Sequence, residues 1–324
     1  MANANDKSDP LGFIDRDSLE GYQLERIAIV NRGEAAIRLI RAVRELNYER
    51  RLRLATVALY TEPDRQALFV HEADDAVCIG PATFIDQRDG KSKSCYLDLD
   101  RIEQALVTAR VDMAWAGWSL LAEEPRLADI CERLGIVFVG PDAATLRLLS
   151  DQIRTRRLVE QVNIPVVPWS GKPIETEAEA RHQAEQLGYP LVIKPAFGSQ
   201  RGRIHRVSSP AELASAFEFA RDEAGHSFND PTVFLERVID SARRIEVQVI
   251  ADRYGTTRVA GVIDCTVQHH SQWLLGESSS PALLPEQERR LREVAVHLCH
   301  LTGYQNAGSV VFLYNPDQNT FWFL

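Results

Sequence analysis

The stretch Leu187–Val207, LGYPLVIKPAFGSQRGRIHRV, determines how the second half of this chain folds. Its apolar run Leu191–Ile193 predicts a short buried strand that delivers Lys194 to a loop, and Ile204–Val207 predicts a second strand. The loop between them, residues 198–203, is rich in small and cationic residues. Backbone N–H and guanidinium groups in such a loop bind phosphate oxygens, so the hairpin predicts an anion-binding flap. The alternative is that Lys194 is an ordinary solvated side chain at a strand end.

The length and composition of the chain restrict its class. With 324 residues it exceeds the size of one hydrophobic core, so we expect two or more domains. A hydrophobic content of 45% with 26% charged residues is typical of a soluble globular protein. The net charge of −9 argues against non-specific binding to nucleic acid, and no apolar run reaches membrane-spanning length. We therefore expect neither a nucleic acid nor a membrane as a partner.

The cysteines and the N-terminus indicate the compartment. The five cysteines form no CxxC pair and their number is odd, and Cys78 and Cys131 stand in apolar contexts. They are predicted to be reduced core residues. Residues 1–24 form a polar lead-in without the apolar core of a signal peptide. We expect a cytoplasmic protein.

Residues 25–150 alternate between strand and helix patterns. The run Arg26–Asn31 predicts a buried strand, and the helix after it carries an apolar stripe at Ala36, Leu39, Ile40 and Val43. The alternation continues to about residue 140, which predicts crossover connections and a doubly wound parallel sheet, an α/β domain. The first strand-to-helix turn, Asn31–Glu34, has one glycine, so a dinucleotide site is not expected.

Residues 151–240 have the pattern of a smaller α+β subdomain. A charged helix, Asp151–Gln161, comes first, and Thr176 with Glu179 forms a capping-box pattern for the next helix. The hairpin around Lys194 follows, and Ser209 opens a further helix. We expect this segment to form a lid.

Residues 241–324 are rich in strand patterns. Arg244–Ala251 alternates polar and apolar residues, which predicts an antiparallel strand with one wet face. A strong helix begins at Pro285, and a hairpin is predicted from Ala307–Tyr314 and Thr320–Leu324. Because the last predicted strand is incomplete, we expect a truncated product, a fragment or one half of a split system.

The order of these elements resembles that of ATP-grasp enzymes, and more closely that of biotin carboxylase, the ATP-using module of acyl-CoA carboxylases. The segments that carry the resemblance are Ile29–Glu34, Ala116–Trp118, Val139–Pro141, Ile193–Lys194, Leu235–Arg237, Glu246–Val249, Asp264–Cys265 with Gln268, and Ala307–Val310. The phrases WAGW, VPWSG and GESSSPALLPEQ are most similar to large fused acyl-CoA carboxylases. The resemblance implies a biotin carboxylase N-terminal domain at 25–150, an ATP-grasp lid at 151–240 and an incomplete ATP-grasp C-terminal subdomain at 241–324.

The resemblance also implies an activity, its cofactors and its partners. Members of the family use ATP, Mg²⁺ and bicarbonate to carboxylate biotin, which is carried as a substrate. They work with biotin carrier and carboxyltransferase domains or subunits, so a homodimer or an assembly with an active carboxylase is expected. The implied nucleotide-binding residues are Gln152, Lys194, Gly198, Gln200, Arg201, Glu236, Arg237, Val238, Ile239, Arg244 and Glu246. Those implied for the bicarbonate and biotin region are Gln268, Ser271 and Trp273.

Individual roles follow from the same resemblance. Lys194 is expected to contact the ATP phosphates, and the hinge at 236–239 to read adenine through its backbone. Glu246 is expected on the polar face of its strand, towards the ribose.

The chain departs from the family at several charged positions. Gln152 and Trp273 replace lysines, Ser271 replaces a histidine, and Val311 stands where the first metal carboxylate is expected. The phosphate loop keeps only two glycines, and the remaining metal and bicarbonate groups would follow Leu324. We therefore expect no intact catalytic or metal-binding set.

Three hypotheses remain. The chain is a biotin carboxylase module, a catalytically inactive relative that binds nucleotide or serves as a scaffold (a pseudoenzyme), or a gene fragment. The internal replacements at 152, 273 and 311 favour the inactive relative.

Overall fold

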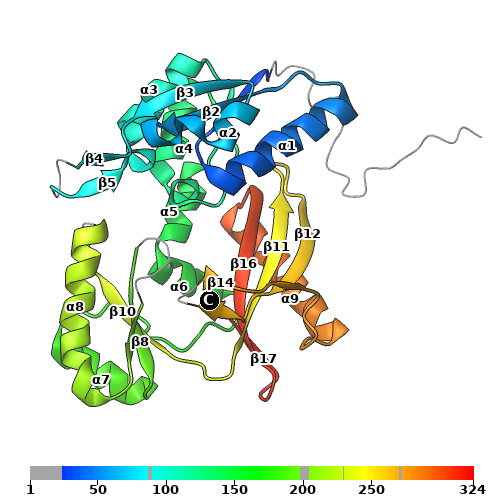
Figure 1. Ribbon diagram of the computed structural model, residues 1–324. Helices are drawn as coiled ribbons and strands as arrows, with labels where there is room; N and C mark the ends of the chain where they lie inside the picture. The colour runs from blue at the N-terminus through cyan, green and yellow to red at the C-terminus, as the bar shows by residue number, and fades with distance from the viewer. Residues whose placement is uncertain (1–23, 87–89, 198–203, 229, 270–271) are drawn as a thin grey trace, which may run out of the picture. The chain divides into compact units, whose positions relative to one another are not determined.

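The computed structural model describes residues 24–86, 90–197, 204–228, 230–269 and 272–324 (Figure 1). The chain divides into two compact units. The first comprises Met1–Ala143 with Asp252–Arg258, and the second comprises Ala144–Ala251 with Val259–Leu324.

The first unit is a parallel α/β domain. Its elements are β1 (Arg26–Ile29), α1 (Gly33–Arg50), β2 (Ala55–Thr61), η2 (Glu62–Gln66), α2 (Leu68–Glu72), β3 (Asp75–Gly80), β4 (Thr83–Ile85), β5 (Ser92–Ser94), η3 (Cys95–Leu97), α3 (Leu99–Ala109), β6 (Met113–Trp115), η4 (Leu120–Glu123), α4 (Pro125–Leu134) and β7 (Val137–Phe138). The main sheet has the order β3-β2-β1-β6-β7, and every neighbouring pair is parallel. The short antiparallel hairpin of β4 and β5 was not predicted.

Helices cover both faces of this sheet. On one face, Ile102 and Leu106 of α3 and Leu127 of α4 pack in one buried cluster with alternate residues of β1 and β2. On the other, Ile40 of α1 and Phe69 of α2 pack with the remaining residues of the same strands. The predicted doubly wound parallel sheet is confirmed.

The prediction for one cysteine is wrong. Cys95, Cys131, Cys265 and Cys299 are buried, whereas Cys78 is exposed. Cys78 lies on β3, the edge strand of the sheet, which has only one neighbour to cover it.

The chain from α5 onward contains a second set of elements. They are α5 (Ala143–Ser150), α6 (Gln152–Gln161), α7 (Glu177–Leu187), β8 (Leu191–Pro195), β9 (His205–Val207), α8 (Pro210–Phe228), β10 (Val233–Arg237), β11 (Arg243–Ala251), β12 (Thr257–Asp264), β13 (Gln268–His269), β14 (Gln272–Trp273), β15 (Glu277–Ser278), α9 (Pro285–Thr302), β16 (Asn306–Asn315) and β17 (Thr320–Phe323). None of the helices in the described part of the chain is both long and apolar enough to cross a membrane.

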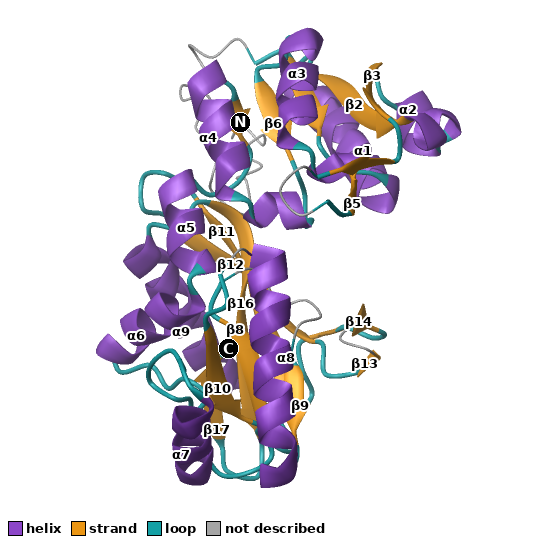
Figure 2. Cartoon of the chain, turned by 90° about the vertical axis from the view of Figure 1, so that its left-hand side faces the viewer, coloured by secondary structure: helices purple, strands orange, loops and turns teal. Residues whose placement is uncertain are grey.

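The lid is the antiparallel sheet β10-β8-β9 with two helices on one face (Figure 2). Ile193 and Leu235 point to α7 and α8, where they pack with Phe217. Because side chains alternate along a strand, Lys194 and Glu236 fall on the opposite face. That face carries the charged residues of the candidate site.

The remaining strands form the antiparallel sheet β15-β12-β11-β16-β17. Ile245, Val247 and Phe312 pack against α9 and form the core of this part. Arg244 and Glu246 alternate with those residues on β11 and belong to the other face of the sheet. The predicted lid and antiparallel subdomain are both present.

Phe312 is fully buried, and its ring meets that of Phe321 edge-on with centroids 5.9 Å apart. We expect Phe312→Ala to lower the free energy of unfolding by about 3–5 kcal/mol, because a large cavity opens in the core. Urea denaturation measures this change. Phe219→Ala is the control because Phe219 is 59% exposed, so a comparable loss there would contradict the assignment of the core.

Candidate functional site

Three charged side chains meet inside the second unit. Lys194 of β8 and Glu236 of β10 form an ion pair, and Arg156 of α6 pairs with the other oxygen of the same carboxylate. Arg156, Lys194 and Glu236 are only 2%, 3% and 2% exposed. We call these three residues the buried charge cluster. The solvated alternative for Lys194 is wrong, because the lid strand and α6 enclose its side chain.

Arg156 holds the cluster to the lid in a second way. Its guanidinium carbon lies 4.7 Å from the centre of the Phe234 ring, and Phe234 is the register partner of Lys194 and lies two residues before Glu236 on the same face of the lid sheet. Its Nη1 atom donates weakly to Gln152, at 3.3 Å from Oε1 and 3.4 Å from the backbone oxygen. Gln152 is itself anchored, since its N–H donates to the Ala196 carbonyl at 2.9 Å.

The buried charge cluster shifts the pKa values of Lys194 and Glu236. Burial, which disfavours the charged amine, lowers the pKa of Lys194, and the nearby positive charges of Arg156 and Arg244 act in the same direction against the attraction of Glu236. Burial alone would raise the pKa of Glu236, but the charges of Lys194 and Arg156 outweigh it and hold this pKa below its ordinary value. Glu236 is therefore ionised at neutral pH.

The predicted adenine hinge, 236–239, begins at Glu236. The N–H of Arg237 donates to the Pro168 carbonyl at 2.8 Å, and that of Val238 donates to the Pro190 carbonyl at 3.1 Å. These two N–H groups hold the hinge to the rest of the lid, so they are not spare donors for a base. Arg237 itself is exposed. A role of 236–239 in reading adenine stays a prediction.

The second face of the site comes from β11 and β16. Arg244 contacts Glu246 at 3.3 Å, and Glu246, 6% exposed, stands directly across from Val311 in the sheet register. Arg244 lies close enough to Lys194 to affect its pKa. The structure thus brings together the predicted residues of the lid and of the sheet.

A cavity of about 220 Å³ lies beside the buried charge cluster, between α6 and β16. Gln152, Arg156 and Val311 all line it. Two positions at which the resemblance implies charged residues, 152 and 311, therefore face the same space, and both are uncharged. Of these three residues, only Arg156 brings a charge to this wall.

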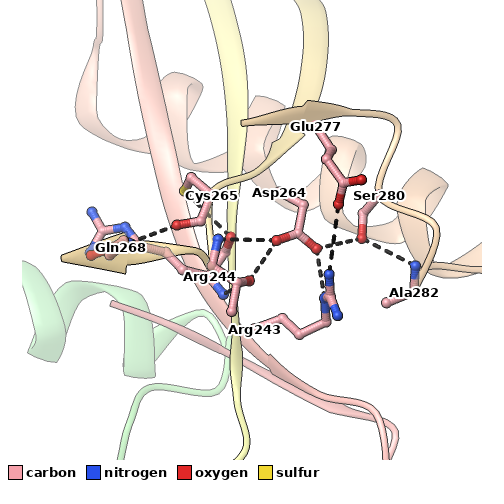
Figure 3. A network of polar contacts seen from close by, with 9 residues as sticks. Arg243, Arg244, Asp264, Cys265, Gln268, Glu277, Ser280 and Ala282 are labelled. Carbon is pink, nitrogen blue, oxygen red and sulfur yellow. Dashed lines mark hydrogen bonds and ion pairs between the residues drawn. The ribbon is translucent and has the colours of Figure 1, made fainter. Parts of the chain in front are cut away.

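A polar network anchors the loop that carries Gln268 (Figure 3). Asp264, 2% exposed, accepts hydrogen bonds from Arg243 Nε at 2.6 Å, Ser280 Oγ at 2.7 Å and Thr266 Oγ1 at 2.5 Å. Burial favours the neutral form of Asp264, but these donors hold its pKa below the ordinary value. The network fixes the end of β12, from which the chain turns towards Gln268.

Gln268 is fixed in turn by Nε2, which donates to the Cys265 carbonyl at 2.8 Å, as Figure 3 shows. Trp273 is its register partner in the two-stranded ribbon of β13 and β14, so the predicted pair of positions is adjacent. Trp273 is 46% exposed. The predicted residues Gly198, Gln200, Arg201 and Ser271 lie outside the described residues.

Comparisons with known proteins identify the family. Residues 23–146 match the family model for the biotin carboxylase N-terminal domain, and residues 151–324 match that for the ATP binding domain of the carbamoyl-phosphate synthase L chain. The chain belongs to the biotin carboxylase family of ATP-grasp proteins.

Biotin carboxylase 1 of Bacillus subtilis is 36% identical over 301 residues, which are 93% of this chain and 64% of that protein. Biotin carboxylase of a Nostoc species is 34% identical, over 90% of this chain and 62% of that protein. The chain thus spans about three fifths of these two relatives. The propionyl-CoA carboxylase alpha chain of Ruegeria pomeroyi is 31% identical, over 92% of this chain and 42% of that longer protein.

Solved structures agree with this relationship. The biotin carboxylase–β,γ-ATP complex from Campylobacter jejuni has a TM-score of 0.83 and 31% identity over 93% of this chain and 64% of its own. The biotin carboxylase domain dimer of 2-oxoglutarate carboxylase from Hydrogenobacter thermophilus, bound to ADP, its magnesium salt and bicarbonate, has a TM-score of 0.82 and 30% identity. That match covers 93% of this chain and 63% of the domain.

The described residues around position 311 do not fit the magnesium that the family implies. Val311 offers no oxygen ligand, and its neighbour Glu246 is already paired with Arg244. Within the described ranges, no group of three or more His, Cys, Asp or Glu side chains is placed to hold a metal ion.

Sequence reasoning missed Arg156 and the role of Asp264 in the network. A signal for Arg156 was present, because it lies three residues after Ile153 and three before Val159, inside the apolar stripe of α6. An arginine at a core position needs a buried acidic partner. No linear pattern indicates that this partner is Glu236, 80 residues away.

Glu236→Gln tests the buried charge cluster. The change leaves Lys194 and Arg156 without a counter-charge, so we expect a loss of about 3–5 kcal/mol in unfolding free energy near pH 7. The lowered pKa of Glu236 means that its contribution is present above the ordinary value of 4.5 and disappears as pH falls through the lowered pKa. Urea titrations at falling pH should therefore show the two proteins converging. A difference in unfolding free energy between the two proteins that stays constant across this acid range would contradict the ion-pair assignment.

Asp264→Ala tests the network around Gln268. Removing the carboxylate leaves the buried Ser280 hydroxyl and the half-buried Arg243 guanidinium without this acceptor. We therefore expect faster hydrogen exchange at Cys265 and Gln268 and a loss of about 3 kcal/mol in stability. Ser280→Ala, which removes one of the donors, is the graded comparison, with an expected loss of about 1 kcal/mol. Exchange unchanged in both variants would show that the network does not hold the loop.

Proposed function

We propose that this chain is a nucleotide-binding module of biotin carboxylase type that does not itself carboxylate biotin. The observation that carries the proposal is the buried charge cluster together with uncharged Gln152 and Val311 on the neighbouring cavity wall. The first feature supports the binding of ATP, and the second argues against metal-dependent phosphoryl transfer.

ATP binding is supported by the charge of the site. Lys194 and Arg156 share one carboxylate, so the cluster carries one positive charge in excess. Phosphate oxygens are suitable counter-ions for such a site, because charge-assisted hydrogen bonds are strong where water is excluded. Arg244 and Glu246 supply polar groups on the facing strand, where the resemblance places the ribose.

The absence of carboxylation is supported by three internal replacements. Transfer of a phosphoryl group needs the developing charge on its oxygens to be compensated, usually by metal ions. Val311 offers no ligand, and neither Gln152 nor Trp273 has the charge of the lysine it replaces. Each lost group of this kind removes several kcal/mol of transition-state stabilisation, at roughly the scale of an oxyanion-hole donor.

The proposed partners are those of the relatives. We propose that the chain associates with a biotin carrier and carboxyltransferase, or with another, active carboxylase, and that it acts there as a nucleotide-responsive or scaffolding component. A relative named as the alpha chain of propionyl-CoA carboxylase and a solved domain dimer support an assembly of this kind.

An active biotin carboxylase module is the second candidate. The anchoring of Gln268 by the Asp264 network favours it, because a residue held for bicarbonate would need such support.

Calorimetric titration with ATP, with magnesium and with EDTA, tests the proposal. We expect affinities that agree within about threefold in the two conditions, because Lys194 and Arg156 supply cations and Val311 supplies no metal ligand. Lys194→Met should weaken binding by about tenfold or more, since a buried charge-assisted contact is lost. Arg181→Met, an exposed position on the lid helix α7, is the control.

Two results would overturn the proposal. Binding that requires magnesium, or formation of ADP that depends on bicarbonate and biotin, would support the active module instead. A cooperatively folded chain without any ATP binding would exclude the nucleotide-binding function.

A further inference from the structure

Arg156 has hydrogen-bonding capacity that the protein does not use. Its side chain is 2% exposed, yet its Nε atom has no hydrogen-bond partner, the one such buried side-chain atom found in the described ranges. Its Nη1 contacts to Gln152 are long, at 3.3 and 3.4 Å, so only the ion pair with Glu236 is a strong interaction. An unsatisfied donor in a buried guanidinium is unfavourable and indicates an acceptor still to be bound.

The charge count indicates that this acceptor is an anion. Lys194 already neutralises Glu236, so the positive charge of Arg156 is the excess charge of the cluster. A buried uncompensated charge destabilises a fold unless a ligand pairs with it. The cluster therefore does not need Arg156 to balance Glu236.

Arg156 lies on the wall of a cavity. Gln152 and Arg156 are four residues apart on α6, which places them on one face of the helix, and both line the 220 Å³ cavity. Gln152 is the position at which the resemblance implies a nucleotide-binding lysine. The cation at this wall of the cavity is thus Arg156, which lies one helical turn after Gln152 along α6.

We propose that Arg156 is a phosphate-binding residue of this nucleotide site, and that it supplies the positive charge that Gln152 does not carry. The inference rests on the proposed nucleotide-binding function. The Nε–H group of Arg156 and an N–H group on a free edge of its guanidinium donate to one phosphate group. The Nη2 atom keeps its contact with Glu236. The net positive charge of Lys194, Glu236 and Arg156 then balances one negative charge of the ligand.

The experiment compares the wild-type chain with Arg156→Met by calorimetric titration with ATP and with adenosine as a competitor. We expect about a tenfold loss of ATP affinity, corresponding to one charge-assisted hydrogen bond, and no change in competition by adenosine. Because Arg156 also joins α6 to the lid through Glu236 and Phe234, the comparison of the two ligands, and not the melting temperature, decides its role. A purely structural arginine would weaken the binding of ATP and of adenosine equally.

Two further variants sharpen the test. Gln152→Lys in the Arg156→Met background should restore ATP affinity to within about threefold of the wild type, because it returns a cation to the same wall. Arg154→Met removes an exposed arginine of the same helix and should change nothing. Should Arg156→Met fail to melt cooperatively, Arg156→Lys and Arg156→Gln take its place, with ATP binding kept in the first and weakened in the second.

The outcomes separate this inference from the proposed function. ATP binding by the wild type that is unchanged in Arg156→Met, or equal affinity of the lysine and glutamine variants, overturns the role of Arg156 and leaves the proposed function standing. No ATP binding by the folded wild type overturns both.

Discussion

The buried charge cluster is the interaction that organises the second unit. Arg156 comes from the helix that precedes the lid, whereas Lys194 and Glu236 come from two strands of the lid sheet. Three charged groups can be buried only when they meet with matched geometry, because each of them unpaired would strongly destabilise the fold. The contact therefore specifies how α6 docks on the lid, and the Phe234 ring beneath the guanidinium adds an apolar surface to it.

The same principle operates on the other sheet. Asp264 is buried and ionised because Arg243, Ser280 and Thr266 donate to it, and this network holds the chain where it leaves β12. Arg243 is thereby committed to an internal contact, while its neighbour Arg244 is directed to Glu246. Arg243 and Arg244 thus make different contacts because side chains alternate along β11.

The candidate site combines features of a nucleotide-binding site with losses that affect catalysis. Lys194 and Arg156 are enclosed with Glu236, and Gln268 is held by the Asp264 network. Gln152 and Val311 line the neighbouring cavity without a charge, at two positions where the resemblance implies a lysine and a metal carboxylate. These features are the basis of the proposal that the chain holds a nucleotide without stabilising a transferring phosphoryl group.

Local sequence was enough to predict the alternation of strands and helices, the hairpin around Lys194 and the capping of α7, where Thr176 accepts from the N–H of Glu179 at 3.2 Å. These features depend on local periodicity and on hydrogen bonds between near neighbours, which a linear pattern records. The motifs from Ile29 to Val310 also identified the family, because they fix residue types at set positions. In contrast, the enclosure of Lys194, the sharing of its carboxylate partner with Arg156 and the exposure of Cys78 on an edge strand became known from the three-dimensional structure. Burial and ion pairing depend on segments far apart in the sequence, such as Arg156 and Glu236, and no local pattern specifies which of them will meet.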